Sequence, residues 1–209
     1  MTTQIKNVVF DIGNVIVRWS PVEIMKLTFG DGEVSDADNL ENSFKSIFQS
    51  ETWMQLNKGY ISVDEAKAQY QQSIGLTKQQ ADSLFYYVTQ TQILLYGSVE
   101  LLKRTKAAGY KVYALTDNVH EIVSYLKSAY DFWELFDGAI VSAEVGLLKP
   151  QAEIYQTLLE KFDLKADETV FLDDMPHNVK GAQAVGMQAI QFKNAIQCEA
   201  DLKALGVLV

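Results

Sequence analysis

Hydrophobic and polar residues are arranged in two different ways along this chain, and the change comes near residue 97. Residues 5–10 form a short apolar run that predicts a buried strand. Residues 18–96 then have mostly helical spacing, with apolar side chains that can share an inner face: Phe44, Ile47, Phe48, Trp53, Met54 and Leu56. We interpret this stripe as the packed interior of a helical unit.

From residue 97 onward, helical and strand-like segments alternate. The pattern predicts strands at residues 111–115, 139–141, 169–172 and 188–192, and helices at 99–107, 119–128, 151–162, 178–185 and 199–205. Alternation of this kind is typical of right-handed βαβ units. The predicted fold class is therefore α/β, with a Rossmann-like parallel sheet and helices on both of its faces.

The helical segment interrupts this α/β pattern directly after the first strand. In open α/β sheets the functional crevice lies beyond the carboxyl ends of the strands, so an insertion at this point can cover the crevice. We predict a catalytic core formed by residues 1–17 and 97–209, and a helical cap formed by residues 18–96. The two crossings between them, near residues 17–20 and 95–98, are candidate hinges.

Composition fits a globular protein and excludes several classes. The 209 residues are 48% hydrophobic and 22% charged, with three prolines, which suits one domain with an insert or two small domains. A net charge of −9 argues against nucleic-acid binding, which depends on clustered Lys and Arg. No apolar run approaches the roughly 18 residues of a membrane span. Charge gives no clear oligomer signal, and we expect a monomer or a weak oligomer.

Cysteine usage and the N-terminal segment indicate where the protein works. Cys198 is the single cysteine, so no disulfide can form within the chain. Met1 leads straight into the first predicted strand, without the basic and apolar pattern of a signal peptide. Both observations predict a reducing, cytoplasmic location.

Polar and charged residues gather where the predicted strands end. Asp11 follows the first strand, Thr116, Asp117 and Asn118 follow the second, Lys149 precedes a helix, and Asp173 and Asp174 follow the strand at 169–172. The carboxyl ends of parallel strands lie at one edge of a sheet, so these side chains are expected to face one cleft. The sequence therefore predicts a carboxylate-rich site that can hold a cation.

The order of these segments resembles the haloacid dehalogenase-like hydrolase superfamily. The similarity is greatest to the branch with Asp-x-Gly-Asn-Val in the first motif, which includes sugar-phosphate phosphatases such as glucose-1-phosphatase. Here the first motif is residues 11–15, and residues 173–179, Asp-Asp-Met-Pro-His-Asn-Val, match the last motif of that branch. The resemblance implies a magnesium-dependent phosphatase acting on a small phosphorylated metabolite, in particular a sugar phosphate.

The resemblance also implies a role for each motif residue. Asp11 is the expected nucleophile, which forms an aspartyl-phosphate, and Lys149 is the second catalytic residue. The expected Mg²⁺ ligands are Asp11, the Gly13 carbonyl, Asp174, and Asp173 directly or through water. Phosphate contacts are expected from Gly13, Asn14, Thr116, Asp117 and Asn118.

The negative charges of the carboxylates and the phosphate would repel each other, so this interpretation requires both a cation and Lys149. Asp11, Asp173 and Asp174 contribute three negative charges, and a phosphate monoester adds about two more near neutral pH. Mg²⁺ and Lys149 offset about three of these. At about 4 Å, each opposite-charge contact is worth roughly 4 kcal/mol for an effective dielectric constant of about 20.

Two positions depart from the broader superfamily pattern. The commoner first motif has a second Asp two positions after the nucleophile, which protonates the leaving group, whereas this chain has Gly13. A metal-bound water, His177 or a cap residue can supply the proton instead. Asp117 stands where the branch usually has Asn. Beside an anionic substrate this carboxylate must turn away, pair with a cation or be protonated.

Two other functions remain open from sequence. The first is a 2-haloacid dehalogenase-type hydrolase, in which Asp11 attacks carbon and no metal is needed; the paired Asp173 and Asp174 argue against it, because a metal-free site gains nothing from extra buried anions. The second is a catalytically weak binding protein on the same fold. Arg18 and Trp19 begin the cap and can face either its interior or the substrate.

Overall fold

A single parallel sheet organises the protein. The computed structural model describes residues 4–30 and 37–209, so residues 31–36 of the predicted cap lie outside the described part. The sheet has five strands in the order β3-β2-β1-β4-β5, and every neighbouring pair is parallel. The strands are β1 (Asn7–Phe10), β2 (Lys111–Thr116), β3 (Gly138–Val141), β4 (Thr169–Asp173) and β5 (Gln188–Gln191). This architecture confirms the predicted fold class.

The side chains of the central strand β1 alternate between two hydrophobic clusters. Val8 and Phe10 pack in one cluster and Val9 in the other, and all three are fully buried. A strand buried on both faces reads as the continuous apolar run seen in the sequence. In register, Phe10 pairs with Ala114 of β2 and with Leu172 of β4. The residues that follow these three strands are thereby held side by side.

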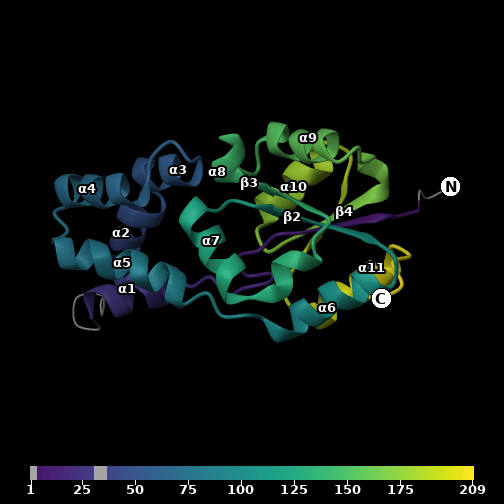
Figure 1. The fold of residues 1–209 in the computed structure, drawn as a ribbon, viewed down its shortest axis with the longest axis horizontal. Coiled ribbons are helices and arrows are strands. Elements are labelled where there is room, and N and C mark those ends of the chain that lie inside the picture. Colours follow the sequence, from purple (N-terminus) through teal and green to yellow (C-terminus); the bar gives the residue numbers. More distant parts are fainter. Residues whose placement is uncertain (1–3, 31–36) are drawn as a thin grey trace.

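Helices cover both faces of the sheet (Figure 1). Helix α6 (Tyr96–Ala107) packs against α11 (Ala195–Ala204), and α9 (Ala152–Lys161) packs against α10 (Pro176–Ala184). The remaining core helices are α7 (His120–Ala129) and the short α8 (Ser142–Val145), with 3-10 turns η1 (Asp131–Leu135) and η2 (Ala166–Glu168). Helices α6, α10 and α11 begin earlier than predicted, and for α10 the signal was Pro176 at its first position.

The other helices, with residues 18–20 before them and 91–95 after them, form a separate cluster, called here the helical block, at one end of the molecule (Figure 1). They are α1 (Pro21–Phe29), α2 (Ala37–Phe48), α3 (Glu51–Asn57), α4 (Val63–Ser73) and α5 (Lys78–Gln90). Ser20, Ser50, Ser62 and Thr77 cap four of them by accepting a hydrogen bond from a backbone N–H three residues later. The domain boundaries at residues 17/18 and 96/97 stay a prediction. None of the helices within the described ranges is long and apolar enough to cross a membrane.

The two crossings between the sheet and the helical block run beside each other. The Arg18 N–H donates to the Ile93 carbonyl at 2.8 Å, and the Leu95 N–H donates to the Ile16 carbonyl at 2.9 Å. These backbone hydrogen bonds hold both predicted hinge segments in one short ribbon. Their role as hinges stays a prediction.

The helical block also touches the core at the end of α3, where Gly59 meets α8. Gly59 has a left-handed backbone with φ of +70°, and a Cβ at this position would lie 2.2 Å from the Ala143 carbonyl oxygen. Nearby, the Tyr60 hydroxyl donates to the Gly146 carbonyl at 3.4 Å. The close approach of block and core therefore requires glycine at this position.

We predict that Gly59→Ala destabilises the protein more than Gly75→Ala. Gly75 has nearly the same φ, +72°, but a Cβ there would have open space. Gly75→Ala should cost about 1 kcal/mol for the left-handed backbone alone. Gly59→Ala should cost at least about 2 kcal/mol, because the methyl group also collides with backbone. Denaturant unfolding of the two variants measures the difference, and equal losses would show that the block does not rest on α8.

Candidate active site

Three carboxylates meet at the edge of the sheet where β1 and β4 end. Asp11 follows β1, Asp173 is the last residue of β4, and Asp174 is next in the chain. One oxygen from each carboxylate lies within 4.8 Å of the others. Asp11 and Asp173 are buried, and Asp174 is half-buried. The parallel pairing of β1 with β4 thus brings together residues that are more than 160 positions apart in sequence.

Lys149 lies between two of these carboxylates. Its Nζ is 2.9 Å from Asp11 Oδ1 and 2.7 Å from Asp173 Oδ2, and it also donates to the Leu115 carbonyl at 3.4 Å. The lysine side chain is only 1% exposed. Burial alone would lower the pKa of Lys149, but Asp11 and Asp173 raise it above its ordinary value. Lys149 is therefore a fixed cation.

The protein's own donors occupy both oxygens of Asp173. Oδ1 accepts hydrogen bonds from the Met175 N–H at 2.8 Å and from Asn178 Nδ2 at 3.0 Å. Oδ2 accepts from Lys149 at 2.7 Å and from the same Asn178 amide at 3.1 Å. This carboxylate anchors the lysine and the start of α10, which leaves it poorly placed to bind a cation without an intervening water. Asn178 thus holds Asp173 in place through its side-chain amide.

Asp11 and Asp174 have fewer protein donors. The Ile12 N–H donates to Asp11 Oδ1 at 2.7 Å, and Asn14 Nδ2 donates to Asp174 Oδ2 at 3.1 Å. Burial raises the pKa of Asp11 well above its ordinary value, against the effect of Lys149. Burial also raises the pKa of Asp174, partly offset by Asn14. A nearby cation would relieve both rises, because it favours the charged forms.

A divalent cation fits this donor set. Three carboxylates face one buried lysine, so the cluster keeps two negative charges when all groups are ionised. Mg²⁺ prefers oxygen ligands and is usually held by one or two carboxylates with waters and substrate phosphate. Asp11 and Asp174 are the carboxylates with oxygens left to bind it. Gly13, whose carbonyl was a further expected ligand, lines the same cavity.

Asn14 links this cluster to the first residues of the helical block. Its φ of 54° is left-handed, a conformation that Asn tolerates better than most residues. The side-chain amide donates to Asp174, and its Oδ1 accepts the Trp19 N–H at 2.9 Å. Asn14 thereby fixes the position of Trp19 relative to the candidate metal site.

Asp117 was expected to turn away from the substrate, pair with a cation or be protonated, and the structure shows a different arrangement. Its carboxylate accepts the Lys149 backbone N–H with both oxygens, at 3.1 and 3.2 Å, so it holds the loop that carries the lysine. Burial raises the pKa of Asp117, and Lys149 opposes the rise. Asp117 still lines the cavity.

The neighbouring expected phosphate contacts differ in placement. The Asn118 N–H, expected to face phosphate, donates to Ser142 Oγ at 2.8 Å, and this hydroxyl donates to the Asn57 carbonyl of α3 at 2.6 Å. Asn118 nevertheless lines the cavity. Thr116 is buried as the last residue of β2, and it is not part of the cavity lining.

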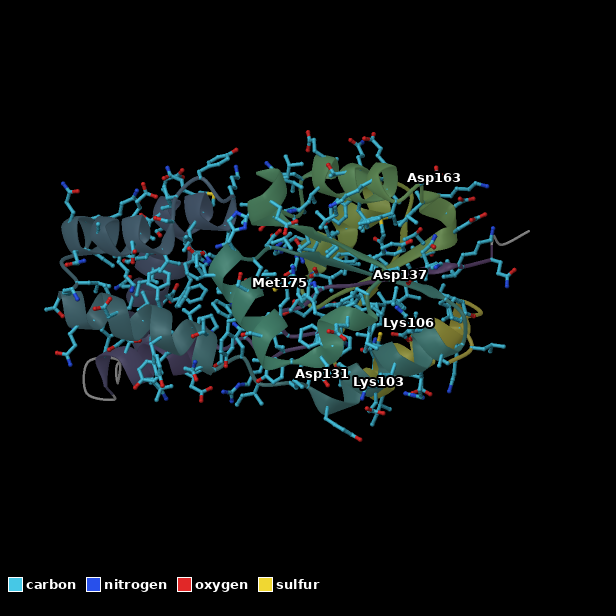
Figure 2. All side chains as sticks on the ribbon, in the orientation of Figure 1. Lys103, Lys106, Asp131, Asp137, Asp163 and Met175 are labelled. Carbon is cyan, nitrogen blue, oxygen red and sulfur yellow. The ribbon has the colours of Figure 1, made fainter. Side chains whose placement is uncertain are left out.

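A cavity of about 370 Å³ lies above the carboxylates, between the sheet edge and the helical block. Its polar part includes Asp11, Asn14, Lys149 and Asp174. Met175, directly after the carboxylate pair, lies on the side of the core that faces the helical block (Figure 2) and also lines the cavity. His177, at the second position of α10, is exposed and lines it too, whereas His120 does not.

The helical block lines this cavity with Trp19, Phe48, Trp53 and Met54, called here the apolar wall. The sequence interpretation of Phe48, Trp53 and Met54 as interior residues was therefore incomplete. Phe48 is largely buried, but Met54 is 43% exposed. Arg18 does not line the cavity, and its guanidinium pairs with Glu23 at 2.6 Å.

Sequence analysis missed two amides of the block that also line the cavity, Asn57 and Gln92. Both are polar residues that the fold buries, at 7% and 3% exposed. They belong to no sequence motif, and their place in the cavity lining becomes apparent only from the position of α3 and α5 over the sheet edge. The hydroxyl of Ser142, which joins α3 to the core, was missed for the same reason.

The sequence is similar to those of known hydrolases and phosphatases. A sequence model of the haloacid dehalogenase-like hydrolase family matches residues 5–186. The sesquiterpene phosphatase astK of Aspergillus oryzae is 32% identical over 205 residues, which are 98% of this chain and 98% of that protein. The D-ribitol-5-phosphate phosphatase of Bacteroides thetaiotaomicron is 24% identical over 213 residues, covering 96% of this chain and 98% of that protein.

Other relatives are longer or more distant. The chain spans 36% of the length of drimenol cyclase drtB of Aspergillus calidoustus, with 21% identity over 204 residues. Among solved structures, a HAD family enzyme from Bacteroides thetaiotaomicron in complex with magnesium and inorganic phosphate superposes with a TM-score of 0.71. It has 21% sequence identity, and the match covers 91% of this chain and 95% of that one. This likeness shows a shared fold.

We predict that Asp174→Asn removes the stabilisation of the protein by Mg²⁺. At a Mg²⁺ concentration 100 times the Kd, binding should add about 2.7 kcal/mol to the unfolding free energy of the wild type. Without metal, the variant should be at least as stable as the wild type, because burial disfavours the charge of Asp174. Thermal unfolding with and without Mg²⁺ measures both effects.

Asp163→Asn is the matched control for this prediction. It makes the same carboxylate-to-amide change at an exposed residue remote from the helical block (Figure 2). The control should keep the full Mg²⁺ effect. Equal stabilisation of both variants by Mg²⁺ would place the metal away from Asp174.

Proposed function

This chain belongs to the haloacid dehalogenase-like hydrolase family, and from that membership we propose that it is a magnesium-dependent phosphatase that hydrolyses a small phosphomonoester through an aspartyl-phosphate on Asp11. The observation that carries the proposal is the convergence of Asp11, Asp174 and Lys149 in one cavity, where a buried carboxylate contacts a fixed cation. Such a site can accept a dianion only if positive charge surrounds it.

The residues of the chain have distinct roles in this reaction. Lys149 and the Ile12 N–H hold one oxygen of Asp11, which orients the carboxylate for attack on phosphorus. As the new oxygen–phosphorus bond forms, the bond from phosphorus to the alcohol oxygen breaks, and the alcohol oxygen takes a proton from water or from His177, which lines the cavity. Water then attacks the aspartyl-phosphate, which releases inorganic phosphate and restores Asp11.

Positioning of the charges accounts for most of the catalysis in this proposal. Lys149 neutralises negative charge on the phosphoryl group, and Asp173 fixes the lysine. Asp11, Asp174 and the Gly13 carbonyl would hold Mg²⁺, with Asp173 acting through water. When bound, the ion supplies positive charge to the phosphoryl oxygens and lowers the repulsion between phosphate and carboxylates. Gly13, Asn14, Asp117 and Asn118 line the space for the phosphate.

The proposal extends to the chemical class of the alcohol that the phosphate esterifies. The branch resemblance favours a sugar phosphate, and the ribitol-5-phosphate phosphatase of similar length supports that class. The sesquiterpene phosphatase is more similar in sequence and acts, by its name, on an apolar molecule. Both relatives support a phosphomonoester, and together they leave the alcohol open between a polyol and an apolar chain.

We predict that Asp11→Asn abolishes Mg²⁺-dependent hydrolysis of p-nitrophenyl phosphate. The amide cannot form the covalent intermediate, so kcat/KM should fall at least about 10³-fold. Asp163→Asn should keep wild-type turnover, since it makes the same chemical change at an exposed site. A steady-state assay with Mg²⁺, and again with a chelator, measures the effect.

The same assay separates the two alternative functions. Turnover of a 2-haloacid that survives the chelator would favour the dehalogenase reaction, which needs no metal. If the wild type hydrolyses no phosphomonoester while Mg²⁺ still stabilises it, the chain is a binding protein on this fold. Either result would overturn the phosphatase proposal.

We further predict that Gly13→Asp makes hydrolysis less dependent on the leaving group. A Cβ at this position would lie 3.8 Å from the Trp19 Cβ, an ordinary contact, so the variant should fold. A carboxyl two positions after Asp11 can protonate a poor leaving group, and such help is typically worth about 10²- to 10⁴-fold. The ratio of kcat/KM for p-nitrophenyl phosphate to that for an alkyl phosphate should therefore fall. An unchanged ratio would show that another group already supplies the proton.

A further inference from the structure

We infer that the alcohol part of the substrate is an apolar chain, bound along the apolar wall of Trp19, Phe48, Trp53 and Met54. This inference rests on the proposed phosphatase function and concerns only the part of the cavity beyond the phosphate. The observation that carries it is the origin of the lining residues: the carboxylates and Lys149 come from the core, whereas the helical block contributes four apolar side chains and two amides.

The apolar wall is one continuous surface. The rings of Trp19 and Trp53 stack with centroids 5.9 Å apart and an interplanar angle of 21°. Phe48 packs edge-on against Trp53 at 5.0 Å and against Trp19 at 5.5 Å. Met54, next to Trp53 in α3, is 43% exposed and can adapt its shape. Apolar surface left accessible inside a cavity is stabilised when a ligand removes it from water.

The core continues the apolar surface on the other side of the cavity. Ile122 of α7, Leu148 before the catalytic lysine and Met175 before α10 all line it. A ligand that extends away from the carboxylates therefore meets apolar side chains from both the helical block and the core. An extended hydrocarbon chain can bury its surface against both.

A polyol would find few partners beside the wall. The helical block offers two amides to the cavity, Asn57 and Gln92. One N–H of Asn57 donates to the Trp53 carbonyl at 2.8 Å and one of Gln92 to the Val88 carbonyl at 3.1 Å, which leaves each amide one N–H and its oxygen for a ligand. Within the part of the block that the structure describes, no charged side chain lines the cavity. Hydroxyl groups that lie against the four apolar side chains would lose water without gaining a partner, which is costly, so the apolar wall disfavours a sugar.

The wall offers a flat aromatic base no slot between two rings. Sandwiching a base requires two ring faces separated by two stacking distances, roughly 7 Å. Trp19 and Trp53 already stack directly on each other at 5.9 Å, so no slot lies between them. The wall presents a surface along which a chain can lie.

The wall begins close to the phosphate end. Asn14 holds both the Asp174 carboxylate and the Trp19 N–H, so Trp19 is fixed beside the candidate metal site. The first carbons after the ester oxygen should therefore already contact the wall, and each added methylene should contribute until the cavity is full.

Alkyl phosphates of increasing length test this inference. We expect kcat/KM to rise about fourfold per methylene from ethyl to butyl to hexyl phosphate, the value expected for full burial of each group. Glycerol phosphate, ribitol 5-phosphate and flavin mononucleotide should all be poorer substrates than hexyl phosphate. Each compound is assayed with Mg²⁺ and the full-length protein, below the concentration at which the alkyl phosphates form micelles.

Two variants of Met54 locate the effect. Met54→Gln places a polar group of similar length in the wall, and Met54→Leu keeps the wall apolar. Because Met54 is partly exposed, both variants should fold. The dependence of kcat/KM on chain length should become shallower in Met54→Gln and stay near the wild-type slope in Met54→Leu.

The outcomes distinguish this inference from the proposed function. If a polyol phosphate or flavin mononucleotide is hydrolysed better than hexyl phosphate, or if both Met54 variants keep the wild-type slope, the apolar chain is wrong while the phosphatase stands. If no phosphate ester is hydrolysed, or if Asp11→Asn retains full activity, the phosphatase proposal itself fails.

Discussion

The buried ion pair of Lys149 with Asp11 and Asp173 is the interaction on which the site depends. Two carboxylates at the ends of adjacent parallel strands would repel each other strongly without a cation between them. Lys149 offsets one charge and holds both carboxylates within 3 Å of its Nζ. Breaking such a pair by removing one partner typically costs about 3–5 kcal/mol, because it leaves an uncompensated buried charge.

The loop that carries Lys149 is positioned by the neighbouring elements. Asp117, after β2, accepts the Lys149 backbone N–H. Gly181 in α10 lets the loop approach, since a Cβ there would lie 2.9 Å from the Pro150 carbonyl oxygen. The lysine is thus held by β2, β4 and α10 together. This accounts for a carboxylate at position 117, where the resemblance gave reason to expect an amide.

The sequence was sufficient to predict that the three carboxylates and Lys149 meet, and insufficient to predict which hydrogen bonds each of them makes. Parallel strands end at one edge, so apolar runs followed by Asp11 and Asp173 are enough to place both carboxylates together. Three of the four hydrogen bonds that Asp173 accepts, by contrast, depend on the path of the chain into α10, and the fourth comes from Lys149. The apolar wall was hidden for another reason. Helical spacing identifies an apolar face, but it cannot separate a face that packs inside the block from one that lines a cavity, and α3 turns Trp53 and Met54 to the same cavity.

In the proposed reaction, charged and apolar residues act on different parts of the substrate, because Coulombic forces extend over longer distances than van der Waals contacts. In that reaction, the Coulombic attraction from Lys149 and the bound cation acts on any phosphate, and it requires fixed geometry from a rigid sheet. Van der Waals contacts along the wall are short-ranged and additive, and in the inferred binding mode they select the alcohol by its length and shape. Because the helices of the block also pack against one another, substitutions in the apolar wall can alter its shape without moving the carboxylates. Asn14 forms hydrogen bonds to both Asp174 and the Trp19 N–H, and it thereby fixes the position of the apolar wall relative to the carboxylates.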